Sequence, residues 1–373
     1  MSTRILFVID GMEFGGGERV FAQILKDLPA QRYTLFLASG SQPSFYEALA
    51  GAGVRTYALD FSNRYRPGIL LQLMKIIREE QIDIVHGQGA RAEFFARLAA
   101  RLAGPVRYIS TVAMPVEGYD VGPAKRLLYR VLDGFTERWV ERFLVVSAVL
   151  KKTLIERHRI PPSRVLLIYN GIETDTYRPE EMAPVRERLR REFAIAEGDP
   201  LIGAIGRLVW QKGFHDLLEA IPLVLRDLPR ARFLLVGDGP LKTDLQEQAR
   251  SLGIGDRLLF AGHRTDIRDL LSAMDTVCIP SLLEGFPMVT LEAMAMERPL
   301  VATAIDGILE QIVDGVEGLL VPPRNAPALA QAMVRLASDP ALASSLAAGA
   351  RLRVVRDFSV RKMIDATIEV YER

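Results

Sequence analysis

The sequence predicts an α/β protein made of two doubly wound domains, each with a parallel sheet covered by helices on both faces. Short, continuous apolar runs alternate with longer segments of helical periodicity. Strands buried on both faces are apolar along their whole length, and strand–helix alternation yields right-handed βαβ units. The alternation pauses near Pro161 and Pro162 and begins again at Leu201. A length of 373 residues also suits two domains.

Each apolar run is expected to form one strand. In chain order, the runs of the first domain are ILFVI, YTLFLA, VRTYAL, IDIVHG, VRYIST and FLVVS, and a further run, VLLIYNGI, follows the pause at Pro161 and Pro162. Those of the second domain are LIGAIG, RFLLVG, RLLFAG, TVCIP, PLVAT and GLLVP. Helices are expected over 16–28, 67–80, 91–102 and 182–193. The first domain is assigned to residues 1–173 and the second to 174–358, and a last helix over 359–373 is expected to cross back onto the first. Because ligands bind at the carboxyl ends of parallel strands, the cleft between the domains is the expected site.

The cysteine count and the apolar stretches indicate a cytoplasmic protein. Cys278 is the single cysteine, so no disulfide can form within the chain, and its apolar run predicts a buried strand thiol. No Cys/His cluster has the spacing of metal ligands. No apolar stretch reaches the ~20 residues that span a bilayer. The first apolar run leads directly into glycines, as expected of a strand rather than a signal peptide.

Charge is distributed unevenly along the chain. Residues 1–170 carry 23 Lys/Arg against 16 Asp/Glu, whereas residues 171–373 carry 24 against 30. Two segments interleave cations with apolar residues, and their cations are Arg91, Arg97, Arg101, Lys125, Arg126, Arg130, Arg138 and Arg142. Such segments can lie against an anionic membrane surface. Alternatively, their apolar residues pack on the sheet and leave a solvated basic face.

Three glycine-containing loops have features of phosphate sites. The glycine run 15–17 follows the first strand and opens the first helix, where backbone N–H groups can approach a diphosphate, although a plain tight turn is the alternative. Gly206 and Arg207 end a strand of the second domain, and Lys212 follows in the next loop. A guanidinium binds two phosphate oxygens and an ammonium supplies a point charge, so this pair is either a phosphate clamp or two solvated cations. Gly237 begins a similar turn, either structural or in contact with a nucleotide.

The stretch EGFPMVTLE contains two carboxylates around a predicted helix start. Pro287 is expected in the first turn of the helix, with free backbone amides near Met288 and Val289. Glu284 then lies in the preceding loop and Glu292 one to two turns inside the helix. Carboxylates accept paired hydrogen bonds from vicinal hydroxyls of a sugar or ribose. Alternatively, Glu284 is an ordinary loop acid and Glu292 an exposed helix acid. The presence of three phosphate-type loops elsewhere in the chain favours a ligand-binding site instead.

Together, the glycine-rich first loop, GRLVWQKGF, VGDGPL, EGFPMVTLE and YNGIE resemble the retaining glycosyltransferases of family 4, whose GT-B fold has two Rossmann-like domains facing a central cleft. The motifs span nearly the whole chain, and their combination is highly specific. The resemblance implies that Arg207 and Lys212 hold the donor diphosphate, that Glu284 binds the donor sugar and that Glu292 binds the ribose. Arg207, Lys212 and Glu284 are the expected catalytic residues. Further donor contacts are implied at Gly16, Gly17, Gly206, Gly237, His263, Arg264, Phe286, Pro287, Met288 and Val289.

One position departs from the family pattern. Members often carry a histidine in a T-x-H pattern after the fifth strand, and Ala113 stands there in STVAMP. A methyl group can neither hydrogen-bond a sugar nor move a proton. Either Glu117 or His86, at the end of the fourth strand, serves instead, or activity is reduced or lost, or Ala113 is an engineered replacement. For His86, a satisfied structural histidine is the alternative.

The expected reaction is transfer of a sugar from a nucleoside diphosphate sugar, with UDP as the expected nucleotide, to an acceptor hydroxyl. Retention is implied by the resemblance, as is a place in bacterial polysaccharide, lipopolysaccharide or glycolipid synthesis. Arg207, Lys212 and helix N-termini can stabilise the leaving diphosphate, so no metal or other cofactor is expected. The expected partners are the nucleotide sugar, a saccharide or lipid-linked acceptor and an anionic membrane surface, but no nucleic acid. The alternatives are a nucleotide-sugar-binding pseudoenzyme, an epimerase and a phosphorylase. A dehydrogenase is disfavoured because no G-x-G-x-x-G is present.

Overall fold

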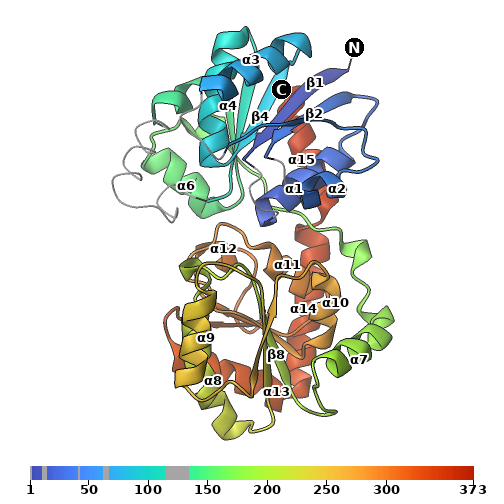
Figure 1. Cartoon of the computed structure of the whole chain (residues 1–373), viewed down its shortest axis with the longest axis vertical. Helices are drawn as coiled ribbons and strands as arrows, with labels where there is room; N and C mark the ends of the chain where they lie inside the picture. Colours follow the sequence, from blue (N-terminus) through green and yellow to red (C-terminus); the bar gives the residue numbers. More distant parts are fainter. Residues whose placement is uncertain (1, 11–14, 41–42, 62–66, 115–133) are drawn as a thin grey trace. The chain divides into compact units, whose positions relative to one another are not determined.

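The computed structural model describes residues 2–10, 15–40, 43–61, 67–114 and 134–373 (Figure 1). The chain divides into two compact units, one of Met1–Asn170 with Val360–Arg373 and the other of Gly171–Ser359. The boundaries expected from the sequence lie after residues 173 and 358. Each unit is a parallel sheet with helices on both faces, which confirms the predicted α/β fold.

The first unit is built on a seven-stranded parallel sheet in the order β3-β2-β1-β4-β5-β6-β7. Its strands are β1 (Thr3–Ile9), β2 (Tyr33–Ser39), β3 (Arg55–Ala58), β4 (Ile84–Gln88), β5 (Arg107–Val112), β6 (Arg142–Val145) and β7 (Val165–Leu167). Its helices are α1 (Gly16–Asp27), α2 (Pro43–Ala48), α3 (Pro67–Glu79), α4 (Ala90–Ala103), α6 (Ala148–Glu156) and α15 (Val360–Glu372), with 3-10 turns η2 (Glu137–Trp139) and η3 (Pro162–Arg164). Helices α3 and α4 pack together on one face, and α1 packs against α2 and α15 on the other (Figure 1).

The second unit is built on a six-stranded parallel sheet in the order β10-β9-β8-β11-β12-β13. Its strands are β8 (Leu201–Ile205), β9 (Arg232–Val236), β10 (Leu258–Gly262), β11 (Thr276–Ile279), β12 (Leu300–Thr303) and β13 (Leu319–Val321). Its helices are α7 (Ala183–Glu192), α8 (Phe214–Asp227), α9 (Lys242–Ser251), α10 (Ile267–Ala273), α11 (Met288–Ala295), α12 (Asp306–Leu309), α13 (Ala326–Ser338) and α14 (Pro340–Asp357), with 3-10 turns η4 (Thr174–Thr176), η5 (Pro179–Glu181) and η6 (Trp210–Lys212). Every predicted apolar run of the two domains corresponds to one of the observed strands.

Helix α8 shows how the sequence pattern builds the core of the second unit. Its residues Phe214, Leu217, Leu218, Ile221 and Val224 are all buried. This spacing puts them on one stripe of the helix, which packs against α13 and the sheet. The helices therefore cover the sheet faces and leave the carboxyl edges of the strands to the loops.

The strand order reverses once in each sheet, between β1 and β4 and between β8 and β11. Loops on either side of such a switch point diverge and form the usual ligand crevice at the carboxyl edge.

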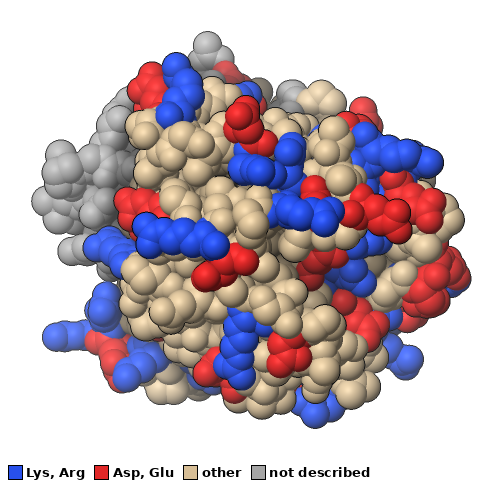
Figure 2. Space-filling model, turned by 90° about the horizontal axis from the view of Figure 1, so that it is seen from below, with Lys and Arg blue, Asp and Glu red and all other residues tan. Residues whose placement is uncertain are grey.

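Among the described residues, no helix is long and apolar enough to cross a membrane. On the face seen from below, acidic and basic side chains are interspersed rather than gathered by sign (Figure 2).

Candidate active site

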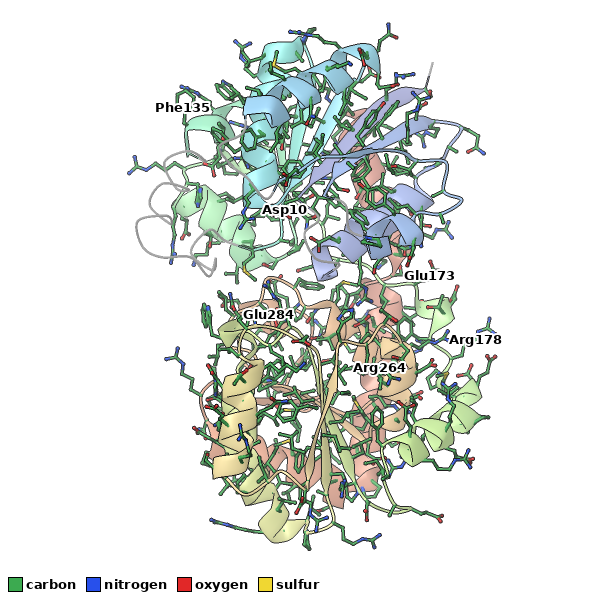
Figure 3. All side chains as sticks on the ribbon, in the orientation of Figure 1. Asp10, Phe135, Glu173, Arg178, Arg264 and Glu284 are labelled. Carbon is green, nitrogen blue, oxygen red and sulfur yellow. The ribbon has the colours of Figure 1, made fainter. Side chains whose placement is uncertain are left out.

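The loops after β8 and β11 lie at the switch point of the second sheet and carry predicted site residues. Lys212 ends the η6 turn after β8, and Glu284 lies in the loop between β11 and α11. The Lys212 ammonium nitrogen lies 2.6 Å from Glu284 Oε1. Figure 3 shows Glu284 at this edge of the second unit. The fold therefore brings together two predicted residues that are 72 positions apart.

Close backbone packing holds these two loops side by side. Gly213 adopts a left-handed φ of 62°, and a Cβ atom there would lie 2.0 Å from the carbonyl oxygen of Pro280, so the position requires glycine. The backbone N–H of Leu282 donates to the carbonyl of Gln211 at 2.7 Å. The cationic loop is thus fixed against the acidic one.

Glu284 is a buried carboxylate with two donors on one oxygen. Its side chain is 7% exposed, and that of Lys212 is 23% exposed. The Ser281 hydroxyl donates to the same oxygen, Oε1, at 2.7 Å. A buried carboxylate keeps its charge only when it is paired and hydrogen-bonded. Because an ammonium has three N–H donors, Lys212 can bind Glu284 and still donate to a phosphate.

The helix α11 begins at Met288, and Pro287 occupies its N-cap position with an extended ψ of 128°. The prediction that Pro287 lies in the first turn is therefore wrong, because this ψ is not helical. The first N–H groups of a helix have no acceptor within it, and here they belong to Met288 and Val289. The positive end of α11 therefore begins directly after the loop that carries Glu284.

Glu292 lies in the second turn of α11 and is only 2% exposed. The hydroxyl of Tyr177, which follows η4, lies 3.4 Å from Glu292 Oε1. Glu292 is therefore a buried, hydrogen-bonded carboxylate. The alternative of an exposed helix acid does not apply to it.

Other predicted donor contacts lie around the same edge. Gly206 and Arg207 directly follow β8, and the Arg207 side chain is exposed. Gly237 has a φ of 142°, and a Cβ atom there would lie 1.9 Å from the Gly206 carbonyl oxygen, so the loops after β8 and β9 touch. The ring of Phe286 is buried against Phe358 at a centroid distance of 5.3 Å. The backbone of Phe286, rather than its ring, is therefore the part that a ligand can meet.

His263 and Arg264 follow β10 at the next loop. His263 is exposed. The Arg264 guanidinium forms a bidentate pair with Asp266, at 2.8 and 2.7 Å, and a third contact with Glu192 at 2.8 Å. These hydrogen bonds, first to Asp266 and then to Glu192, raise the pKa of Arg264. Since the side chain is committed to these acids, only the backbone of Arg264 suits the base contact that the resemblance implies.

In the first unit, Gly16 and Gly17 are the first two residues of α1. Gly15 is the N-cap residue, and its N–H donates to the Glu18 carboxylate at 3.1 Å. This contact satisfies one of the N–H groups at the helix start. An acidic side chain therefore already lies at the helix end that the sequence assigned to a diphosphate.

Ala113 directly follows β5, and the structure excludes His86 as a substitute for the histidine that is missing at this position. His86 is a central residue of β4 and is fully buried: its Nδ1 lies 2.6 Å from the Tyr371 hydroxyl and its Nε2 lies 2.7 Å from Thr111 Oγ1. Burial lowers the pKa of His86 to about 3. A neutral core ring with both nitrogens engaged cannot replace the missing histidine, so that alternative is wrong. Glu117 lies outside the described residues.

The predicted basic clusters are also corrected in part. Arg97 is buried and pairs with Glu93 at 2.8 Å, and its guanidinium also donates to Thr136 Oγ1 at 3.2 Å. It is therefore an internal cation and cannot meet a membrane. Arg138 is exposed and stacks on Phe135, 3.8 Å from the ring centroid. Lys125, Arg126 and Arg130 lie outside the described residues.

Sequence reasoning missed two residues that support Glu284. Thr303, the last residue of β12, donates its hydroxyl to the carbonyl oxygen of Ser281, whose own hydroxyl binds Glu284. Ser281 lies in a loop without regular periodicity, so no sequence pattern predicts its contact with Glu284. Only the adjacency of β11 and β12 could have suggested that residues at their carboxyl ends meet.

Comparisons with known proteins identify the family and the fold of the chain. The family model described as Glycosyltransferase Family 4 matches residues 14–176, and the one described as Glycosyl transferases group 1 matches residues 199–339. The alpha-D-kanosaminyltransferase of Streptomyces kanamyceticus is 30% identical over 318 residues, which cover 81% of this chain and 80% of that protein. The UDP-Gal:alpha-D-GlcNAc-diphosphoundecaprenol alpha-1,3-galactosyltransferase of Escherichia coli is 27% identical over 310 residues, covering 81% and 78%.

A solved structure shares the fold. The Anabaena protein HepE, crystallised in complex with UDP-glucose, matches with a TM-score of 0.87 and 22% identity over 99% of each chain. At this identity the likeness concerns the fold alone, which is GT-B. The family matches and the 30% identical relative, which extend over both units, show that this chain belongs to the glycosyltransferases of family 4.

Proposed function

We propose that this glycosyltransferase moves a sugar from a UDP-sugar to a hydroxyl group of a saccharide or lipid-linked acceptor, with retention of the anomeric configuration. The observation that carries the proposal is the contact between Lys212 and Glu284 at the switch point. Arg207 and the N-terminus of α11 add positive charge beside the same loops. A sugar diphosphate needs hydrogen-bond donors for its phosphates and acceptors for its hydroxyls, and this edge supplies both.

In the transfer, the bond between the anomeric carbon and the β-phosphate oxygen breaks and a bond to the acceptor oxygen forms. The acceptor proton leaves with the diphosphate product. Arg207 and Lys212 stabilise the charge that develops on the leaving diphosphate. Glu284 accepts hydrogen bonds from the donor sugar and Glu292 from the ribose. Because the two cations serve the diphosphate, we propose that no metal is required.

The relatives support the donor and acceptor classes. The E. coli relative is named for transfer from UDP-Gal to a diphosphoundecaprenol-linked sugar, and HepE was crystallised with UDP-glucose. We therefore propose a role in bacterial polysaccharide, lipopolysaccharide or glycolipid synthesis. In that role the enzyme works in the cytoplasm, peripherally on the inner face of the membrane.

A panel of nucleotide sugars, scored by thermal unfolding and then by UDP release, tests the proposal. A true donor at ~100 times its dissociation constant stabilises the fold by about 2.7 kcal/mol. Turnover should survive EDTA, and its loss would contradict the metal-free mechanism. No stabilisation by any nucleotide sugar would refute donor binding. If a nucleotide sugar stabilises the fold but is not turned over with any tested acceptor, the protein only binds nucleotide sugars. This is the second candidate function, because Ala113 stands where family members often have a histidine.

A further inference from the structure

We propose that Ser281, held in place by Thr303, is the positioning residue that orients Glu284 toward the donor sugar. The inference rests on the proposed function, which assigns Glu284 to that sugar. Ser281 is buried in the loop after β11, and its hydroxyl lies 2.7 Å from Glu284 Oε1. It is thus a second anchor for the carboxylate, independent of Lys212.

The two oxygens of Glu284 differ in their surroundings. Oε1 receives both the Lys212 ammonium at 2.6 Å and the Ser281 hydroxyl at 2.7 Å. Oε2 has no hydrogen-bond partner among the residues that the structure describes. A carboxylate oxygen has two lone-pair positions, so Oε1 is saturated. Oε2 is therefore the oxygen that a sugar hydroxyl meets.

The loop that carries Glu284 is anchored at its start by the last residue of β12 and at its end by the segment that follows β12. At its start, Thr303 is buried and donates to the Ser281 carbonyl. At its end, the fully buried Gln311 donates from Nε2 to the Pro287 carbonyl at 3.0 Å. Ser281 is thus fixed to its neighbouring strand and does not depend on a ligand for its position.

The second donor, Ser281, matters because Lys212 is expected to serve two acceptors, Glu284 and the donor diphosphate. When Lys212 donates to a diphosphate, its hold on Glu284 weakens, and glutamate has several side-chain torsions that can then change. The Ser281 hydroxyl keeps the carboxylate in place while Lys212 turns to the phosphates. Loss of that hydroxyl should therefore weaken contacts to the sugar and spare contacts to the nucleotide.

The test compares Ser281→Ala with Ser272→Ala, a matched control. Ser272 is a buried serine of α10 whose hydroxyl donates to the Asp269 carbonyl at 2.6 Å. Calorimetry measures the affinity for UDP and for whichever of UDP-glucose, UDP-galactose and UDP-N-acetylglucosamine the wild type binds best. Ser281→Ala should weaken UDP-sugar binding about tenfold and change UDP binding less than about twofold. Thr303→Val should shift the UDP-sugar affinity in the same direction, and Ser272→Ala should shift neither.

Equal losses for UDP and UDP-sugar, or no loss for either, would overturn the positioning role. Crystal structures of unliganded wild type and Ser281→Ala give a readout that does not depend on the proposed function. More than one orientation of Glu284 in the variant supports the inference, and an unchanged single orientation overturns it. A wild-type protein that binds no nucleotide refutes the proposed function, and the crystal comparison then decides the role of Ser281 by itself.

Discussion

The imidazole Nδ1 of His86 lies 2.6 Å from the phenol oxygen of Tyr371, although 285 positions separate the two residues. His86 lies on β4 and Tyr371 on α15, so the contact joins the last helix to the centre of the first sheet. The other ring nitrogen contacts the Thr111 hydroxyl of β5. A buried polar group with partners on both sides stabilises the packing, and its loss leaves those partners unsatisfied.

We expect His86 to make the stability of the fold depend on pH. Its pKa falls from 6.5 in the unfolded chain to about 3 in the fold because of burial. Below pH 6.5 the unfolded chain therefore takes up a proton that the native state excludes. The contribution to stability is full above pH 6.5 and declines between pH 6.5 and 3. At pH 5 the loss from this single group reaches about 2 kcal/mol.

Urea unfolding of the wild type and of His86→Gln at pH 7.5, 6 and 5 measures this effect. The variant should be less stable at pH 7.5 but lose less stability on acidification. His263→Gln, which changes an exposed histidine, is the control and should keep the pH dependence of the wild type. The same pH dependence in His86→Gln and wild type would contradict the prediction.

We expect Lys212→Ala to weaken UDP binding by about 1.5–3 kcal/mol, because a charged hydrogen bond to the diphosphate is lost. Arg207→Ala should weaken it in the same way. Trp210 lies in the same loop and is partly exposed, so its fluorescence can report binding. Trp139→Phe removes the other of the two tryptophans and provides the background. Unchanged UDP affinity in both alanine variants would remove Arg207 and Lys212 from the donor site.

We expect Glu284→Gln and Glu292→Gln to have different effects. The first should lower turnover more than UDP affinity, since its partner is the transferred sugar. The second should mainly weaken UDP binding, since its partner is the ribose. Steady-state kinetics and calorimetry give the two quantities. If both variants change both quantities equally, the division of roles is wrong.

We expect Ala113→His to leave the fold intact and to raise the transfer rate. His86 is excluded as a replacement, because its ring is fully buried and both of its nitrogens have partners, Tyr371 and Thr111. A histidine at position 113 would restore a group that can hydrogen-bond the reacting sugar. Thermal unfolding checks the fold, and UDP release with a turned-over donor checks the rate. A variant no faster than the wild type would mean that the enzyme does not need a histidine at position 113.

We expect the first unit to bind anionic membranes through the exposed aromatic and cationic residues of 135–139. Phe135 is 54% exposed, lies at the margin of this unit (Figure 3), and stacks with Arg138. Each cation near an anionic surface contributes ~1 kcal/mol.

Sedimentation with anionic and neutral vesicles at low and moderate salt measures this binding. Arg138→Gln should reduce pelleting, and Arg356→Gln, whose side chain is 72% exposed on the second unit, should not. Equal pelleting with both lipids at low salt would identify the cluster as ordinary surface.

The strands were predictable because a strand covered on both faces is apolar along its length, and each such run formed one. The environments of single side chains were harder to predict than the strands. His86 stands in an apolar run that looks the same whether its ring faces a ligand or the core, and the deciding partner is Tyr371. Arg97 has the spacing of a surface cation, and its burial depends on Glu93 and on Thr136 from another segment.

In the candidate site, too, the positions of the residues were predictable from the sequence but their contacts were not. The loop positions of Lys212 and Glu284 follow from strand ends, which sequence periodicity marks. Their direct contact, and the support that Ser281 gives, depend on side-chain directions in loops without a repeat. Sequence therefore places residues at an edge of the sheet, and only the folded chain shows which atoms meet.

During synthesis on the ribosome, α15 emerges only after all of Gly171–Ser359 has been made. Until then the first sheet lacks a covering helix, and the ring of His86 has no phenol partner. The second unit needs no later residue, so it can complete its fold first. The second unit can thus mature before the first although it follows most of it in the sequence, and a nascent chain that stops before Tyr371 would lack the phenol partner of His86.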